Sequence, residues 1–116
     1  MYNYRQIEAE KLEFITVAKA DEIQNGQRLL LEIGGEPIAV FNIAGQYFAI
    51  ADVCSHDDGP VAEGQLEGQE IECPRHGARF DIRSGKVLSL PAVVDIPAYP
   101  VRVEGGEVQV GLPMEE

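Results

Sequence analysis

Apolar side chains in this chain come in short runs, some alternating with polar residues and some continuously apolar. Both patterns are typical of β-strands, and no long segment repeats apolar residues at the 3.6-residue period of an amphipathic helix. The predicted strands are Glu13 to Val17, Leu29 to Ile33, Pro37 to Ile43, Tyr47 to Ile50, Gln69 to Glu72, Arg79 to Ile82, Tyr99 to Val103 and Glu107 to Val110. The pattern therefore predicts a chain that is mostly β.

Residues that reverse the chain separate these runs. Paired glycines supply the positive φ that tight hairpin turns need, and mixed Gly and polar segments serve the same purpose. The predicted turns are Gly34-Gly35, Ala44-Gly45-Gln46, Arg83-Ser84-Gly85-Lys86 and Gly105-Gly106. Hairpins at this spacing predict an antiparallel sandwich or a small barrel. Two short helical pieces are also expected, one turn around Asp21 to Ile23 and an amphipathic arm from Asn3 to Leu12.

The chain has 116 residues, which is the size of one ordinary domain. We expect a single domain over residues 1–116, with a core of about 13–111 and peripheral termini at 1–11 and 112–116. No apolar run approaches the roughly 18 residues that span a bilayer, and the first residues lack the apolar centre of a signal peptide. A cytoplasmic location is the corresponding expectation.

Acidic residues dominate the charge. Twenty Asp and Glu against nine Lys and Arg give a formal net charge of −11. This charge repels nucleic-acid phosphates and anionic lipid surfaces, so we expect neither nucleic acid nor membrane as a partner. Solubility and steering toward a basic protein surface explain the acidity equally well.

The two cysteines and two histidines of the chain lie within one 23-residue stretch, in the pattern Cys54-x-His56, sixteen residues, then Cys73-x-x-His76. Each of two loops thus offers one thiol and one imidazole, and all four are candidate metal ligands. Tetrahedral zinc is one alternative. Ordinary zinc fingers, however, place two Cys in one knuckle and two His in the other, whereas mixed knuckles suit two irons held side by side.

Cys54-Ser55-His56 with Cys73-Pro74-Arg75-His76-Gly77 resembles the Rieske motif, and the resemblance extends from about Phe14 to Val110. It implies an all-β, antiparallel Rieske-type β-sandwich with a small cluster-binding subdomain of two loops. It also implies one [2Fe–2S] cluster, with one iron held by Cys54 and Cys73 and the other by His56 and His76. Neutral imidazole ligands raise the reduction potential above that of an all-cysteine cluster.

Four positions bear on the kind of Rieske protein. High-potential members of the family join the two loops by a disulfide, and the matching positions here are Gly59 and Arg75. Those members also place a Ser and a Tyr hydroxyl near the cluster, where this chain has Ala78 and Phe80. Fewer donors stabilise the reduced cluster less, so we expect a potential at the low end of the Rieske range, on the order of −150 mV.

The resemblance is to soluble ferredoxin components of bacterial ring-hydroxylating dioxygenase systems. It implies a one-electron carrier between a flavin-containing NAD(P)H reductase and a terminal oxygenase. The alternatives are a stand-alone Rieske ferredoxin associated with iron–sulfur cluster assembly or another redox pathway, and a non-redox or zinc-binding interaction subunit. We do not expect an enzyme, because the cysteines are committed as ligands and no further His is available as a base.

The surroundings of the motif predict how electrons leave. We expect the imidazoles on the solvent side, because a thiolate-bound iron gains from burial among backbone amides. Acidic residues from Asp52 to Glu72 precede the second knuckle, and basic residues from Arg75 to Lys86 follow it, which predicts a local charge gradient. On this interpretation Arg75 orients a transient protein interface, although solvated loop charges without a partner are equally compatible with the pattern.

Overall fold

The computed structural model describes residues 12–113, and the predicted arm from Asn3 lies outside them except for Leu12. The described chain contains ten strands and one short 3-10 turn. The elements are β1 (Leu12–Lys19), η2 (Ala20–Glu22), β2 (Arg28–Ile33), β3 (Glu36–Ile43), β4 (Gln46–Ala51), β5 (Leu66–Glu67), β6 (Glu70–Glu72), β7 (Arg79–Asp81), β8 (Ala98–Tyr99), β9 (Val101–Glu104) and β10 (Glu107–Pro113). Within this part of the chain no helix is long and apolar enough to cross a bilayer.

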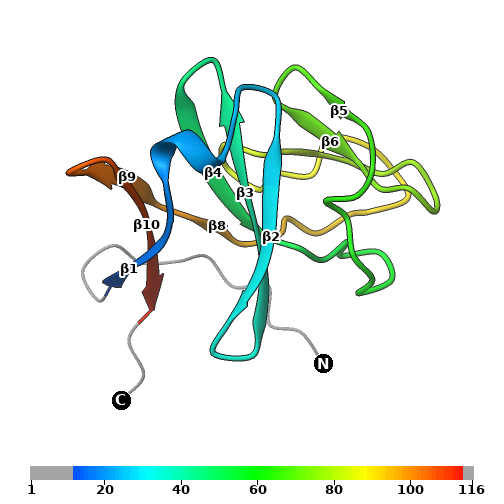
Figure 1. Ribbon diagram of the computed structural model, residues 1–116. Helices are drawn as coiled ribbons and strands as arrows, with labels where there is room; N and C mark the ends of the chain where they lie inside the picture. The colour runs from blue at the N-terminus through cyan, green and yellow to red at the C-terminus, as the bar shows by residue number, and fades with distance from the viewer. Residues whose placement is uncertain (1–11, 114–116) are drawn as a thin grey trace.

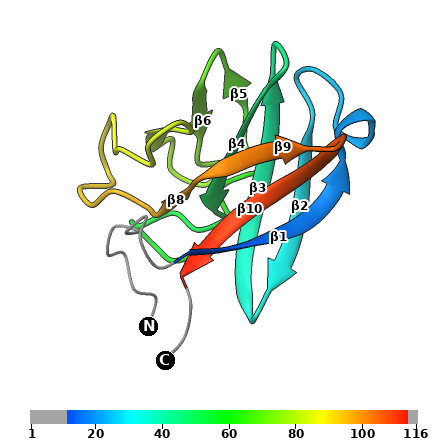
Figure 2. The same cartoon turned by 90° about the vertical axis from the view of Figure 1, so that its left-hand side faces the viewer.

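Two of the three sheets form a sandwich. One sheet has the order β1-β10-β9 and the other the order β2-β3-β4-β8, and every strand pair is antiparallel. Figure 2 shows the first of these sheets in front of the second, with its strands crossing those behind. The predicted all-β, antiparallel fold is confirmed.

Tight hairpins connect neighbouring strands because the turn residues adopt the left-handed backbone that such turns require. At the β2–β3 turn, Gly34 and Gly35 have φ of 58° and 83°. Ala44 has a φ of 53° at the β3–β4 turn, which is unusual for a residue with a side chain. Its N–H donates to Asn25 Oδ1 at 2.7 Å, and this bond supports the turn.

The structure corrects two predicted strands and confirms the predicted helical turn, which is η2. The run Tyr99 to Val103 is split at Pro100, which has no N–H to continue a ladder, so β8 pairs with β4 and β9 with β10. The last strand does not end at Val110 but continues to Pro113, which pairs with Leu12. Gly111 permits this, because a Cβ there would lie 3.0 Å from the Phe14 ring.

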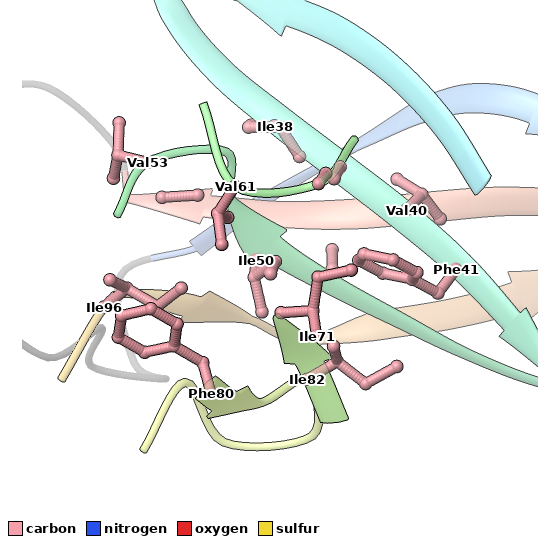
Figure 3. Close-up of a cluster of buried hydrophobic side chains, with 14 of the residues drawn as sticks. Ile38, Val40, Phe41, Ile50, Val53, Val61, Ile71, Phe80, Ile82 and Ile96 are labelled. Carbon is pink, nitrogen blue, oxygen red and sulfur yellow. The ribbon is translucent and has the colours of Figure 1, made fainter. Parts of the chain in front are cut away.

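The third sheet, β5-β6-β7, is small and lies to one side of the sandwich (Figure 1). Its buried residues Ile71 and Phe80, with Ile82 just after it, belong to the same apolar cluster as Ile50 of β4 (Figure 3). The chain segments 52–65 and 73–78, which we call the first and second loop, flank β5 and β6. The shared core therefore fixes both loops against the sandwich.

Candidate metal centre

The first loop begins with a tight knuckle at Cys54. The N–H of Cys54 donates to the carbonyl of Gly59 at 2.7 Å, and the N–H of Asp58 donates back to the carbonyl of Cys54 at 2.7 Å. Asp58 reaches this position with a φ of 62°, a conformation that Asp and Asn tolerate better than most residues. The knuckle thereby holds the Cys54 side chain inward, where it is 0% exposed.

The second loop repeats this plan at Cys73. The N–H of Cys73 donates to the carbonyl of Ala78 at 2.7 Å, and the N–H of Gly77 donates to the carbonyl of Cys73 at 3.0 Å. Gly77, with a φ of 80°, takes the place that Asp58 has in the first knuckle. The two loops differ in length, but each begins with the same hydrogen-bonded turn around a buried cysteine.

Polar contacts from Asp52 and from the sandwich fix the second half of the first loop. Asp52 Oδ1 accepts the N–H groups of Val61 and Ala62 at 2.9 and 2.7 Å. Arg28 on β2 donates to the carbonyl of Gly64 at 2.8 Å. A Cβ at Gly64 would lie 1.7 Å from the carbonyl oxygen of Glu72, so only glycine permits the loop to lie this close to β6.

The four side chains that the sequence singled out lie in these two knuckles, at the same end of the molecule. The rings of His56 and His76 meet edge to face with centroids 4.8 Å apart and an angle of 77° between them. Cys54 and Cys73 are 0% and 1% exposed and form no disulfide, whereas both His residues are exposed. The buried thiols and the solvent-facing imidazoles agree with the exposure that the sequence predicted.

The thiols have an environment that favours a metal. The pKa of the Cys54 thiol is raised to about 11. Burial is the main cause, the neighbouring Cys73 adds to it, and the hydrogen bond from the backbone of His56 offsets part of it. A thiolate here is therefore unfavourable without a cation beside it. Metals that bind thiolates displace the proton and supply that cation, so the donor set fits a thiolate- and imidazole-binding group.

An ion pair that sequence reasoning missed joins the two loops. Arg75 donates to both carboxylate oxygens of Asp57, at 2.6 Å from Nε and 2.9 Å from Nη2. The guanidinium holds the pKa of Asp57 well below its usual range, mainly through these hydrogen bonds. The third nitrogen, Nη1, donates to the carbonyl of Pro60 at 2.7 Å. The Arg75 side chain, for which the sequence predicted a role in docking, therefore binds the first loop of its own chain.

The predicted charge gradient is not preserved in three dimensions. Arg79 lies within 3.4 Å of carboxylate oxygens of Glu67, Glu70 and Glu72, which precede it in the chain. Arg75 pairs with Asp57 in the same manner. Folding therefore interleaves the acidic and basic segments that are separate in the sequence, because the β6–β7 hairpin and the inter-loop contact bring them together.

The family model of the Rieske [2Fe–2S] domain matches residues 13–100. The chain belongs to this family. A ferredoxin component of biphenyl 2,3-dioxygenase from Rhodococcus jostii is 41% identical over 96 residues, which cover 83% of this chain and 90% of that protein. These findings confirm the resemblance on which the sequence interpretation rested.

Solved Rieske structures agree. The ferredoxin of carbazole 1,9a-dioxygenase from Nocardioides aromaticivorans has a TM-score of 0.81 and 32% identity, over 90% of this chain and 100% of that one. A chain from a complex of reduced oxygenase and oxidized ferredoxin in carbazole 1,9a-dioxygenase has a TM-score of 0.80 and 33% identity, over 89% and 97%. The Rieske protein described here is therefore an electron carrier with one [2Fe–2S] cluster.

Proposed function

We propose that the [2Fe–2S] cluster is held by the four side chains of the two knuckles. Cys54 and Cys73 would bind the inner iron, and His56 and His76 the outer one. The observation that carries this assignment is the division of the donors, with both thiols buried and both imidazoles exposed. When bound, the cluster supplies reversible uptake of a single electron.

We further propose that electrons enter and leave at the exposed imidazoles. The rings of His56 and His76 face solvent, whereas the sandwich lies behind the buried thiols. Beside them, Ser55 donates a hydrogen bond to the carbonyl of Val94, so the end of the segment 88–94 lies against the first knuckle. Leu90 and Val93 in this segment are 76% and 74% exposed. Exposed apolar side chains around a redox centre suit the small, short-lived interfaces of electron carriers.

The proposed donor is a flavin-containing NAD(P)H reductase, and the proposed acceptor is a terminal oxygenase. Similarity to the ferredoxin of a complex that also contains the oxygenase supports the acceptor. The net charge of −11 supports partners whose docking surfaces are basic. We place the protein in the cytoplasm, because a reducing compartment keeps the two cysteines available as metal ligands and does not join them as a disulfide.

We also propose a low reduction potential. Ala78 and Phe80 are fully buried behind the second knuckle, and neither carries a hydroxyl to donate to the cluster. Fewer donors stabilise the reduced state less, so the expected potential is on the order of −150 mV.

One preparation tests these proposals. Anaerobically purified protein is analysed for inorganic sulfide and by low-temperature EPR after reduction, and its potential is measured by protein-film voltammetry. We expect sulfide, a rhombic signal of low average g and rapid reoxidation by a terminal oxygenase. A colourless, EPR-silent zinc protein would contradict the ligand assignment, and a potential above about +100 mV would contradict the low-potential proposal.

A further inference from the structure

The contact between Asp57 and Arg75 is the most direct polar link between the two loops. The guanidinium and the carboxylate make two parallel hydrogen bonds of 2.6 and 2.9 Å, which is the geometry of the strongest Arg–carboxylate pairs. The side chains are 34% and 25% exposed, so the pair is partly shielded from water. We call these two residues the inter-loop clamp.

The backbone of the first loop is shaped to receive this guanidinium. Asp57 Oδ1 also accepts the N–H of Gly59 at 3.0 Å, so the carboxylate is fixed within its own loop before it meets Arg75. A Cβ at Gly59 would lie 2.7 Å from Nη2 of Arg75, so a larger residue at position 59 would push the guanidinium out of this place. Nη1 is fixed by the carbonyl of Pro60 at 2.7 Å. Asp57 and Pro60 of the first loop therefore bind one side chain of the second, and Gly59 leaves room for it.

The same carboxylate lies close to the candidate ligands. Asp57 Oδ2 is 3.7 Å from Nδ1 of His76. Carboxylate oxygens of Asp57 also lie within 4.8 Å of the two thiol sulfurs and of nitrogen atoms of both imidazoles. An unpaired negative charge at this distance opposes the arrival of an electron, whereas pairing with Arg75 offsets it.

We propose that Asp57 and Arg75 are positioning residues with two effects: they hold the two loops together around the cluster, and they cancel a carboxylate charge beside the imidazole ligands. This inference rests on the ligand assignment proposed above. It makes retention of the cluster dependent on ionic strength, since a partly exposed ion pair is weakened by salt.

Loss of the cluster to an iron chelator tests the first effect. The variants are Asp57→Asn, Arg75→Met and the double variant, with Arg83→Met as a control that removes a similar Arg–Asp pair on the β7 turn. Each single variant should lose the cluster about tenfold faster than the wild type, and the double variant about as fast as either single one, because one contact is broken in all three. Raising the salt from about 0.1 M to about 1 M should accelerate the wild type but not the double variant.

The reduction potential tests the second effect and separates it from a merely structural role. Arg75→Met leaves the carboxylate unpaired and should lower the potential. Asp57→Asn leaves the guanidinium unpaired and should raise it, and the double variant should return close to the wild type. Arg83→Met should leave the potential unchanged. A general loosening of the loops would instead shift both single variants in the same direction.

The outcomes distinguish this inference from the ligand proposal. If the wild type lacks the EPR signal of the cluster, the ligand assignment fails, and the clamp is judged from amide exchange at Asp58 and Gly77 in the same samples. These amides close the two knuckles and should exchange faster in the variants than in the wild type. Additive effects of the two substitutions on the rate of cluster loss, salt-independent cluster loss or unchanged amide exchange would overturn the clamp.

Discussion

Strands β3 and β4 and the two loops after them lie side by side but are stabilised in different ways. In β3, four consecutive residues, Ile38 to Phe41, are fully buried, so both faces of the strand are covered, and these residues pair with β2 on one side and β4 on the other. Between the two loops, the strands β5 and β6 have only two and three residues. Backbone turns and polar side chains do most of the holding there, and the buried side chains include two thiols.

The two regions therefore have different roles. The apolar sandwich stabilises the fold, and the two loops hold the candidate ligands. Burial of apolar side chains is non-directional and stabilises the sandwich as a whole, through many contacts that act together. The loops depend on directional bonds, such as those that Asp52 and Arg75 make, and gain further stability from whatever binds the thiols and imidazoles. We therefore expect substitutions in the sandwich to act on the whole molecule and those in the loops to act on the cluster alone.

The largest effect is expected for Phe41→Ala in β3, which tests whether a substitution in the sandwich acts on the whole molecule. Phe41 is 0% exposed, so truncation should leave a cavity and cost about 3–5 kcal/mol of unfolding free energy. This is a large part of the 5–15 kcal/mol typical of a domain, so the cluster should be lost together with the strands. Urea unfolding followed by far-UV circular dichroism and by visible absorption measures both. Leu30→Ala in β2, where the side chain is 40% exposed, is the control and should cost much less.

Cys73→Ser should have the opposite effect, with loss of the cluster and retention of the sandwich. Serine nearly matches cysteine in size, but its oxygen is a poor ligand for iron, so cluster content should fall close to zero. The sandwich should remain, because Cys73 lies in the second loop and serine nearly fills its place in the buried cluster. Hydrogen exchange should show the amides of β3 and β4 still protected, while the amides of the second loop become unprotected. Loss of protection throughout the molecule would show that the cluster, and not the apolar core, stabilises the strands.

The sandwich was predictable from the sequence because its causes are local. Alternating or continuous apolar runs and paired glycines indicate strands and hairpins wherever they occur, and the turn at Gly34-Gly35 is one example. The errors came from contacts that are distant in the chain. Pro100 divides a run that looks continuous, and Gly111 to Pro113 join a strand because they pair with the start of β1.

The candidate ligands were predictable for another reason, since chemistry requires thiols and imidazoles whatever the surrounding fold. The ion pair beside the ligands could not be predicted in this way. Asp57 and Arg75 are 18 residues apart, and an exposed Asp in a loop has no sequence feature that names its partner. The only hint was that Gly59 and Arg75 occupy the positions where other Rieske proteins join the same loops.

The smallest predicted effect concerns Asp81, at the end of β7 in the small sheet. Its carboxylate accepts hydrogen bonds from the N–H and the guanidinium of Arg83, at 2.8, 3.0 and 2.8 Å. The side-chain hydrogen bond from Arg83 lowers the pKa of Asp81 from its ordinary value of 3.8. A carboxyl whose folded-state pKa lies below its unfolded value adds stability above that unfolded value and loses it as the pH falls through the folded one.

Asp81→Asn should therefore cost about 0.5–1 kcal/mol near neutral pH, and the difference from the wild type should shrink as the pH falls below about 4. Urea midpoints measured at successive pH values give this difference, with Glu36→Gln at the start of β3 as the control for removing an exposed carboxylate. The cluster content should not change, because the pair lies on the turn after β7 and contacts neither knuckle. A stability difference that is constant down to pH about 3 would show that shape, and not charge, is what Asp81 contributes.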